Sequence, residues 1–142
     1  MSITVEQQQL NDLAHTLEDM SGYICRLEQG CAALPAAFLA EDKSQPLGNL
    51  SHILEGIGYY HKLLQSAIVL LAIDPMEDLL NNISVCSFTE EIHRTFTSVF
   101  QAAEGEDYSL VADLIEYDLI PVVHTARQLL EVMLHRYTER VV

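Results

Sequence analysis

The sequence predicts an all-α protein, an antiparallel bundle of four principal helices. Three observations support this fold. Apolar residues recur every three or four positions over most of the chain, no segment shows the strict alternation of a half-buried strand, and 142 residues are enough for one self-sufficient core. Proline, glycine and polar clusters separate the periodic stretches. We therefore expect residues 1–142 to form a single helical-bundle domain.

The first helix is predicted from a seven-residue apolar repeat. Its alternating steps of three and four residues are typical of a long helix that packs on others at a shallow angle. Gly30 and Pro35 predict a break over residues 30–35, followed by a short helical turn at residues 36–40. The repeat consists of Leu10, Leu13, Leu17, Met20, Ile24, Leu27, Cys31 and Leu34.

A polar loop over residues 41–48 (EDKSQPLG) is predicted to precede the second helix. Further apolar residues widen the apolar face of that helix, which indicates contacts on two sides, as in a central helix or a homodimer interface. The repeat is Leu47, Leu50, Leu54, Ile57, His61, Leu64, Ile68 and Leu71, and the additional residues are Ile53, Tyr60, Ala67 and Leu70.

The third helix is predicted to be broken. Asp74 and Pro75 have the residue types of a helix cap and first helical position. Residues 84–87 interrupt the apolar pattern, and Ser87 followed by Glu90 has the spacing of a capping box, at which the helix would restart. The residues expected to face the core are Met76, Leu79, Leu80, Ile83, Phe88, Ile92, Phe96, Val99 and Ala103.

The fourth helix is predicted over residues 107–137, with Asp107 as its N-terminal cap. Pro121 lacks an N–H group and its ring crowds the carbonyl of Tyr117, so we expect a kink at Pro121. The apolar stripe of this helix consists of Leu110, Val111, Leu114, Ile115, Val122, Ala126, Leu129, Val132 and Met133.

Composition limits the partners of this chain. Seven Lys and Arg against twenty-one Asp and Glu give a formal net charge of −14, which repels phosphate backbones and anionic lipids. We therefore expect no nucleic-acid partner and no membrane binding. The N-terminus lacks the pattern of a secretion signal, and the three cysteines lack the spacing of a zinc site. These features favour a cytoplasmic protein.

Acidic residues are concentrated between Glu104 and Asp118, a segment without Lys or Arg. A helix start stabilises nearby negative charge, which accounts for the first three acids of the segment but not for the later ones. Those acids are either a solvated surface, a weak cation site or a docking face for a basic protein partner. The candidate partner-binding residues are Glu106, Asp113, Glu116 and Asp118.

A metal-binding helical bundle is one alternative function. Glu90 and His93 have the Glu-x-x-His spacing of di-iron bundles, but such a centre needs a second motif and further carboxylates. His61 occupies an apolar seam position, where a hydrogen-bonded histidine is the ordinary interpretation and a ligand the alternative. Asp118 and His124 could lie near it if the second and fourth helices are neighbours. We expect no cofactor, and the candidate ligands are His61, Glu90, His93 and His124.

His52-Ile-Leu-Glu-Gly56 resembles the motif of histidine phosphotransfer domains, which are four-helix bundles with an exposed histidine. His52 lies off the apolar seam and is therefore expected to be exposed, so a phospho-accepting His52 is a second alternative. The family has a lysine three positions after the histidine, and here that residue is Glu55, which would repel a phosphoryl group.

Two longer segments resemble elements of small, uncharacterised, all-helical bacterial proteins. They are EGIGYYHKLL at residues 55–64 and EDYSLVADLIEYDLIPVV at residues 106–123. The elements are Glu-Gly-aliphatic-x-aromatic and a DY…ADL-x-EY-x-L-x-P pattern, and the first often has tryptophan where this chain has Tyr59 and Tyr60. The resemblance implies a helical fold and a bacterial source, and it implies no activity.

No complete catalytic set is present in the sequence, and the absence of one favours a non-enzymatic protein. Together with the acidic segment and the wide apolar face, this indicates a protein-interaction bundle such as an adaptor, a small chaperone or a regulator. Its expected partner is a protein with basic character.

Overall fold

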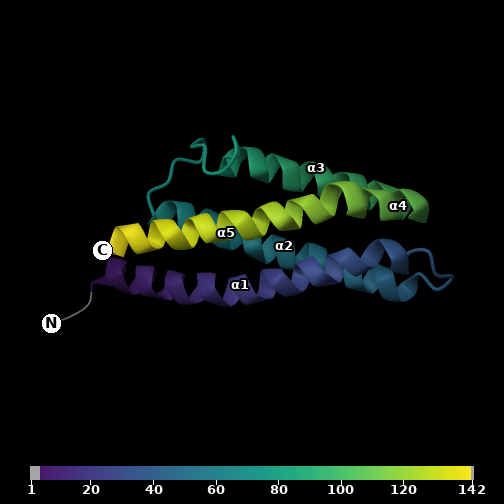
Figure 1. Cartoon of the computed structure of the whole chain (residues 1–142), viewed down its shortest axis with the longest axis horizontal. Coiled ribbons are helices and arrows are strands. Elements are labelled where there is room, and N and C mark those ends of the chain that lie inside the picture. Colours follow the sequence, from purple (N-terminus) through teal and green to yellow (C-terminus); the bar gives the residue numbers. More distant parts are fainter. Residues whose placement is uncertain (1–3, 142) are drawn as a thin grey trace.

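Helices dominate the computed structural model of the chain, which describes residues 4–141 (Figure 1). The last three helical elements follow one another without interruption, so the described residues contain four helical rods and the predicted all-α bundle is confirmed. The elements are α1 (Val5–Ala37), α2 (Ser44–Leu70), α3 (Val85–Glu104), α4 (Tyr108–Leu114), the π-helical turn η1 (Ile115–Leu119) and α5 (Ile120–Val141).

The rods run antiparallel to their neighbours in the chain (Figure 1). Helix α1 packs along its length on both α2 and α5, which makes it the most extensively covered element. Helix α3 lies mainly against α4 and makes fewer close contacts with α2. The α2–α3 side of the bundle is therefore more open than the α1 side.

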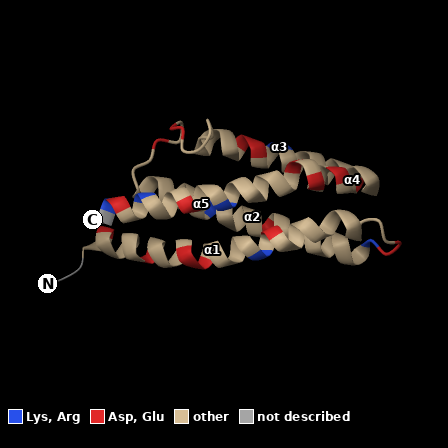
Figure 2. Cartoon of the chain, viewed as in Figure 1, with Lys and Arg blue, Asp and Glu red and all other residues tan. Residues whose placement is uncertain are grey.

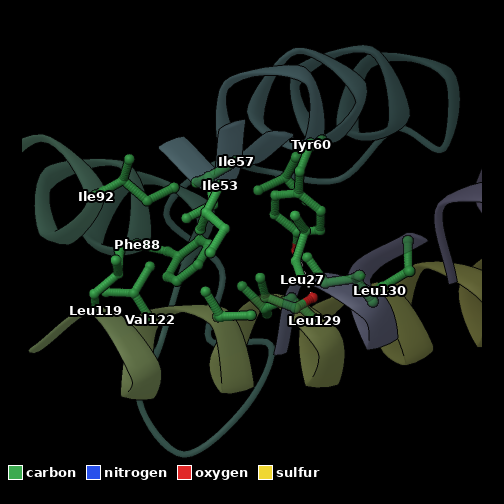
Figure 3. Close-up of a cluster of buried hydrophobic side chains, with 14 of the residues drawn as sticks. Leu27, Ile53, Ile57, Tyr60, Phe88, Ile92, Leu119, Val122, Leu129 and Leu130 are labelled. Carbon is green, nitrogen blue, oxygen red and sulfur yellow. Dashed lines mark hydrogen bonds between the residues drawn. The ribbon is translucent and has the colours of Figure 1, made fainter. Parts of the chain in front are cut away.

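Apolar side chains from α1, α2, α3 and α5 meet in one core (Figure 3). The seam predicted for the first helix is confirmed, because all of its members except the partly buried Met20 are buried. Tyr60 connects three elements: its ring lies edge-to-face on Phe88, with centroids 6.3 Å apart, and its hydroxyl donates a 2.7 Å hydrogen bond to the carbonyl of Ala126.

Two predicted boundaries around the first loop were wrong. Helix α1 passes through Gly30 and Pro35 without a break and ends at Ala37. Pro35 lies in the last turn, so its missing N–H costs one hydrogen bond and little helix follows that a kink could redirect, and burial of Leu34 and Phe38 stabilises this end. Helix α2 begins at Ser44, inside the predicted loop, with Pro46 in the first turn, where a backbone N–H has no helical partner.

The broken third helix was predicted wrongly: residues 71–84 form turns instead of a first helical piece, and residues 85–87, the predicted interruption, are the first turn of α3. Asp74 accepts a hydrogen bond from the backbone of Met76 in a local turn, and Met76 is exposed instead of facing the core. Asn81 and Asn82 adopt positive φ angles of 49° and 67°, which a right-handed helix excludes.

Helix α3 is continuous, and its capping box lies three residues earlier than predicted. Ser84 is the N-cap: its hydroxyl accepts the backbone N–H of Ser87 at 3.1 Å, and the Ser87 hydroxyl accepts the backbone N–H of Ser84 at 3.0 Å. Two serines thus replace the predicted pair of Ser87 and Glu90, because a serine hydroxyl accepts a backbone N–H as a glutamate carboxylate does.

The fourth rod has the predicted cap and the predicted irregularity. Asp107 accepts the backbone N–H of Leu110 at 3.2 Å. The N–H of Ile120 bonds to the carbonyl of Ile115, five residues back, which widens the turn immediately before Pro121. A proline ring crowds the carbonyl four residues before it, and a π turn is one way to relieve that conflict. The ribbon changes direction in this region (Figure 1).

Glycines at two positions of α2 give a stability test. A Cβ at residue 56 would lie 2.6 Å from the Tyr23 hydroxyl oxygen and 3.0 Å from Leu27 Cδ1, whereas a Cβ at residue 58 has no neighbour within 4 Å. We expect Gly58→Ala to raise the free energy of unfolding by about 0.5–1 kcal/mol through helix propensity. Gly56→Ala should lower it by about 1 kcal/mol, because overpacking outweighs the same gain.

Urea unfolding followed by circular dichroism measures both variants. Equal stabilisation by the two alanines would show that α1 and α2 do not approach each other closely at Gly56.

Tyr60→Phe removes a buried hydrogen bond and should lower the free energy of unfolding by about 1 kcal/mol at neutral pH. Burial raises the pKa of the Tyr60 hydroxyl above its ordinary value of 10.0. The unfolded chain therefore releases this proton near pH 10 while the folded chain retains it, so stability falls as pH rises above 10. The fall should be less steep in Tyr60→Phe. Tyr59→Phe, at an exposed neighbour, is the control. It should change neither the free energy of unfolding at neutral pH nor the decrease in stability above pH 10.

Candidate functional site

Four predicted partner-binding residues lie at one end of the fourth rod. Glu106 is in the tight turn before α4, with a φ angle of 56°, Asp113 is on α4, and Glu116 and Asp118 are on η1. All four side chains are exposed. We call Glu106, Asp113, Glu116 and Asp118 the acidic surface.

The π turn determines how part of this surface is presented. Ile115 and Leu119, at its two ends, are fully buried, and the three residues between them are exposed. Tyr117 is 71 % exposed and lies between Glu116 and Asp118 in the sequence. The buried ends hold an acid–aromatic–acid tripeptide toward solvent, and π turns are frequent at functional sites.

Sequence reasoning did not include Tyr117 in the site. On a regular α-helix Asp118, three residues after Ile115, would lie on the apolar side, so the exposure of all three residues between Ile115 and Leu119 depends on the π turn.

The Lys and Arg side chains contact residues other than the four acids of this surface. Figure 2 shows Asp and Glu along α4 and the turn that follows, and no Lys or Arg on α4. Within residues 4–141, no Lys, Arg or His side chain forms an ion pair with the acidic surface. Four arginines pair with other carboxylates and three cations lie over tyrosine rings: Arg94–Glu91, Arg127–Glu28, Arg136–Glu77, Arg140–Glu6, Arg26–Tyr23, Lys43–Tyr108 and Lys62–Tyr59.

His124, one of the candidate metal ligands, belongs to an ionic cluster between α1 and α5. Arg127 Nε donates to Glu28 Oε1 at 2.7 Å, and His124 Nδ1 lies 3.7 Å from the same oxygen. The hydrogen bond and the charge of Glu28 raise the pKa of Arg127. This cluster connects two helices across the bundle, so its geometry supports a structural role.

His61 is half-buried, not a core residue, and its Nε2 lies 3.0 Å from Thr89 Oγ1 on α3 and 3.2 Å from Gln65 Nε2 on α2. His61 thus has hydrogen-bond partners, as the ordinary interpretation expected, but it lies at the edge of the core instead of inside it. The hydrogen-bond partners of His61 differ from the residues that His124 contacts. Glu90 and His93 are exposed on α3. Among the residues that the structure describes, no three His, Cys, Asp or Glu side chains form a group that could hold a metal ion.

His52, the candidate phospho-acceptor, is exposed on α2 as predicted, with 81 % of its side chain accessible. Its Nδ1 lies 3.9 Å from the carboxylate of Glu55. The carboxylate therefore lies beside the imidazole ring, and a phosphoryl group on either ring nitrogen would bring a second negative charge close to it.

An apolar groove of about 370 Å³ lies between α2 and α3. Phe100, which is 54 % exposed, forms part of it. Sequence reasoning missed the groove because it depends on how far apart two helices lie. The lining consists of Leu47, Leu50, Ser51, Leu54, Glu55, Phe96, Val99, Phe100 and Ala103.

No helix within residues 4–141 is long and apolar enough to cross a membrane.

Comparison with known protein families identifies the family of this chain. No curated protein and no solved structure matches the chain. Residues 15–129 match the family described as "Domain of unknown function (DUF8042)", a range that contains the groove, the acidic surface and the two elements noted at residues 55–64 and 106–123. Because the match covers most of the 142 residues, the chain belongs to this DUF8042 family.

Proposed function

We propose that this protein is a non-enzymatic interaction bundle, an adaptor, small chaperone or regulator, whose acidic surface binds a basic segment of a partner protein. The observation that carries the proposal is a group of exposed carboxylates with no cationic partner among the described residues, while the Lys and Arg side chains contact other carboxylates or tyrosine rings. We further propose a cytoplasmic location and a bacterial source.

Arginine is the side chain that suits this surface best. Its guanidinium group binds a carboxylate through two parallel hydrogen bonds and also stacks on an aromatic ring. Glu116, Tyr117 and Asp118 supply both kinds of contact within one turn. Exposed ion pairs contribute only about 0–1 kcal/mol each, so binding needs several of them and should weaken with added salt.

The two alternative functions have less support. In a metal-binding bundle His61 and His124 would have to leave the hydrogen bonds and ionic contacts that they make to other helices. In a phosphotransfer module the phosphoryl group on His52 would lie beside the Glu55 carboxylate. Neither obstacle applies to the binding of a basic segment.

A fluorescein-labelled octa-arginine peptide tests the proposal by fluorescence polarisation. The triple variant Asp113→Asn, Glu116→Gln, Asp118→Asn should bind it about tenfold more weakly, because three surface pairs at about 0.5 kcal/mol each are lost. The variant changes the formal net charge from −14 to −11, since three negative charges are removed.

The matched control is Glu18→Gln, Asp19→Asn, Glu41→Gln, which removes three exposed carboxylates from the first helix and the loop after it. The control has the same net charge as the triple variant and should bind like the wild type. Equal weakening in both variants would mean that overall charge alone attracts the peptide, and the proposal would be rejected.

A further inference from the structure

We infer that the groove between α2 and α3 binds the apolar side of an amphipathic helix that carries basic residues. The inference rests on the proposed function and specifies the partner: the basic segment and the apolar residues belong to one helix. The acidic surface alone indicates only that the partner is basic. The groove adds that the partner has apolar side chains on one side of a helix.

The shape of the groove fits a short helical segment. Its two walls run from Leu47 to Leu54 on α2 and from Phe96 to Ala103 on α3, each about 10 Å long at 1.5 Å per residue, or about two helical turns. Its volume lies at the lower end of the roughly 300–1,000 Å³ typical of ligand pockets. Two turns present apolar residues at positions i, i+3, i+4 and i+7, the pattern that binds in hydrophobic grooves.

The lining separates a buried floor from exposed walls. Leu50, Leu54 and Val99 are at most 8 % exposed and form the floor. Phe96 is partly exposed and Phe100 more than half exposed, so an apolar ligand would remove these rings from water. Burial of aromatic side chains is a large favourable term at interfaces.

Charge selects the kind of helix that would bind. Glu55 lines the groove on α2, and Glu104 and Glu106 follow directly after Ala103 at its opposite end. Lys43 lies at that end as well, but its ammonium group donates to the carbonyls of Phe38 and Ala40 and lies over the ring of Tyr108. An apolar helix flanked by Lys or Arg therefore complements both the floor and the ends.

A second copy of this chain fits the groove less well. Each copy carries a formal net charge of −14, and a symmetric contact would bring the acidic ends of two grooves together. The described lining contains no basic residue that could offset this repulsion.

A designed helical peptide of about 18 residues, or five turns, is the probe. It carries leucines at i, i+3, i+4 and i+7 and lysines on the other positions, and two matched peptides replace the leucines by serine or the lysines by glutamate. We expect the leucine–lysine peptide to bind wild-type protein about tenfold more tightly than either matched peptide, as loss of buried apolar anchors or of charge pairs predicts. Amide chemical-shift changes should map to residues 47–55 and 96–106, which contain the groove and the acids at its two ends.

Phe100→Ser should remove the preference for leucine over serine, because it deletes an exposed wall of the groove without emptying the core. Val69→Ser is the control: Val69 is 77 % exposed on α2 and does not line the groove, so this variant should keep the preference. Circular dichroism checks that both variants are folded.

Three outcomes would overturn the inference. If the leucine and serine peptides bind equally, the groove takes no part, and the proposed function still holds provided that octa-arginine binding depends on the acidic surface. If the glutamate peptide binds as well as the lysine peptide, the partner is not basic. If sedimentation shows a wild-type dimer that Phe100→Ser dissociates, the groove binds a second copy.

Discussion

Burial of the apolar seam of α1 is the constraint on which the rest of this bundle depends. Its seven-residue repeat extends from Leu10 to Leu34, and both α2 and α5 pack along it. The approach is close at Gly56, where a side chain would meet Tyr23 and Leu27. A helix covered on two sides leaves the remaining rod, α3, to pack at the periphery.

The position of α3 explains the groove. Helix α3 begins after a loop of turns, is capped by its own serines, and packs mainly on α4. Phe88 near its start reaches Tyr60 in the core, whereas Phe100 nearer its end stays half exposed beside Leu54 and its neighbours on α2. The two helices thus meet at one end of α3 and leave apolar surface open toward the other.

The ion pairs are also distributed unevenly over the bundle. The arginines of α5 reach carboxylates on α1 and on the loop before α3, as in the pairs of Arg127 with Glu28 and Arg136 with Glu77. These contacts use the few cations of an acidic chain to connect segments far apart in the sequence. The acids of α4 and η1 form no ion pair with such a cation within the described residues, and this leaves a negative surface at that end of the fourth rod.

Local sequence patterns determined much of the secondary structure of this protein. The apolar period of α1, the cap at Asp107 and the disturbance before Pro121 are properties of neighbouring residues, so the sequence alone predicted them. The same reasoning failed at Pro35 and at residues 71–84, where burial of Phe38 and the left-handed turn at Asn81 and Asn82 overrode local preference. Only the tertiary structure decided that His61 and His124 contact different helices, that Tyr117 faces solvent between two acids, and that a groove lies between α2 and α3. Each of these depends on distances between segments remote in the chain, which residue spacing does not specify.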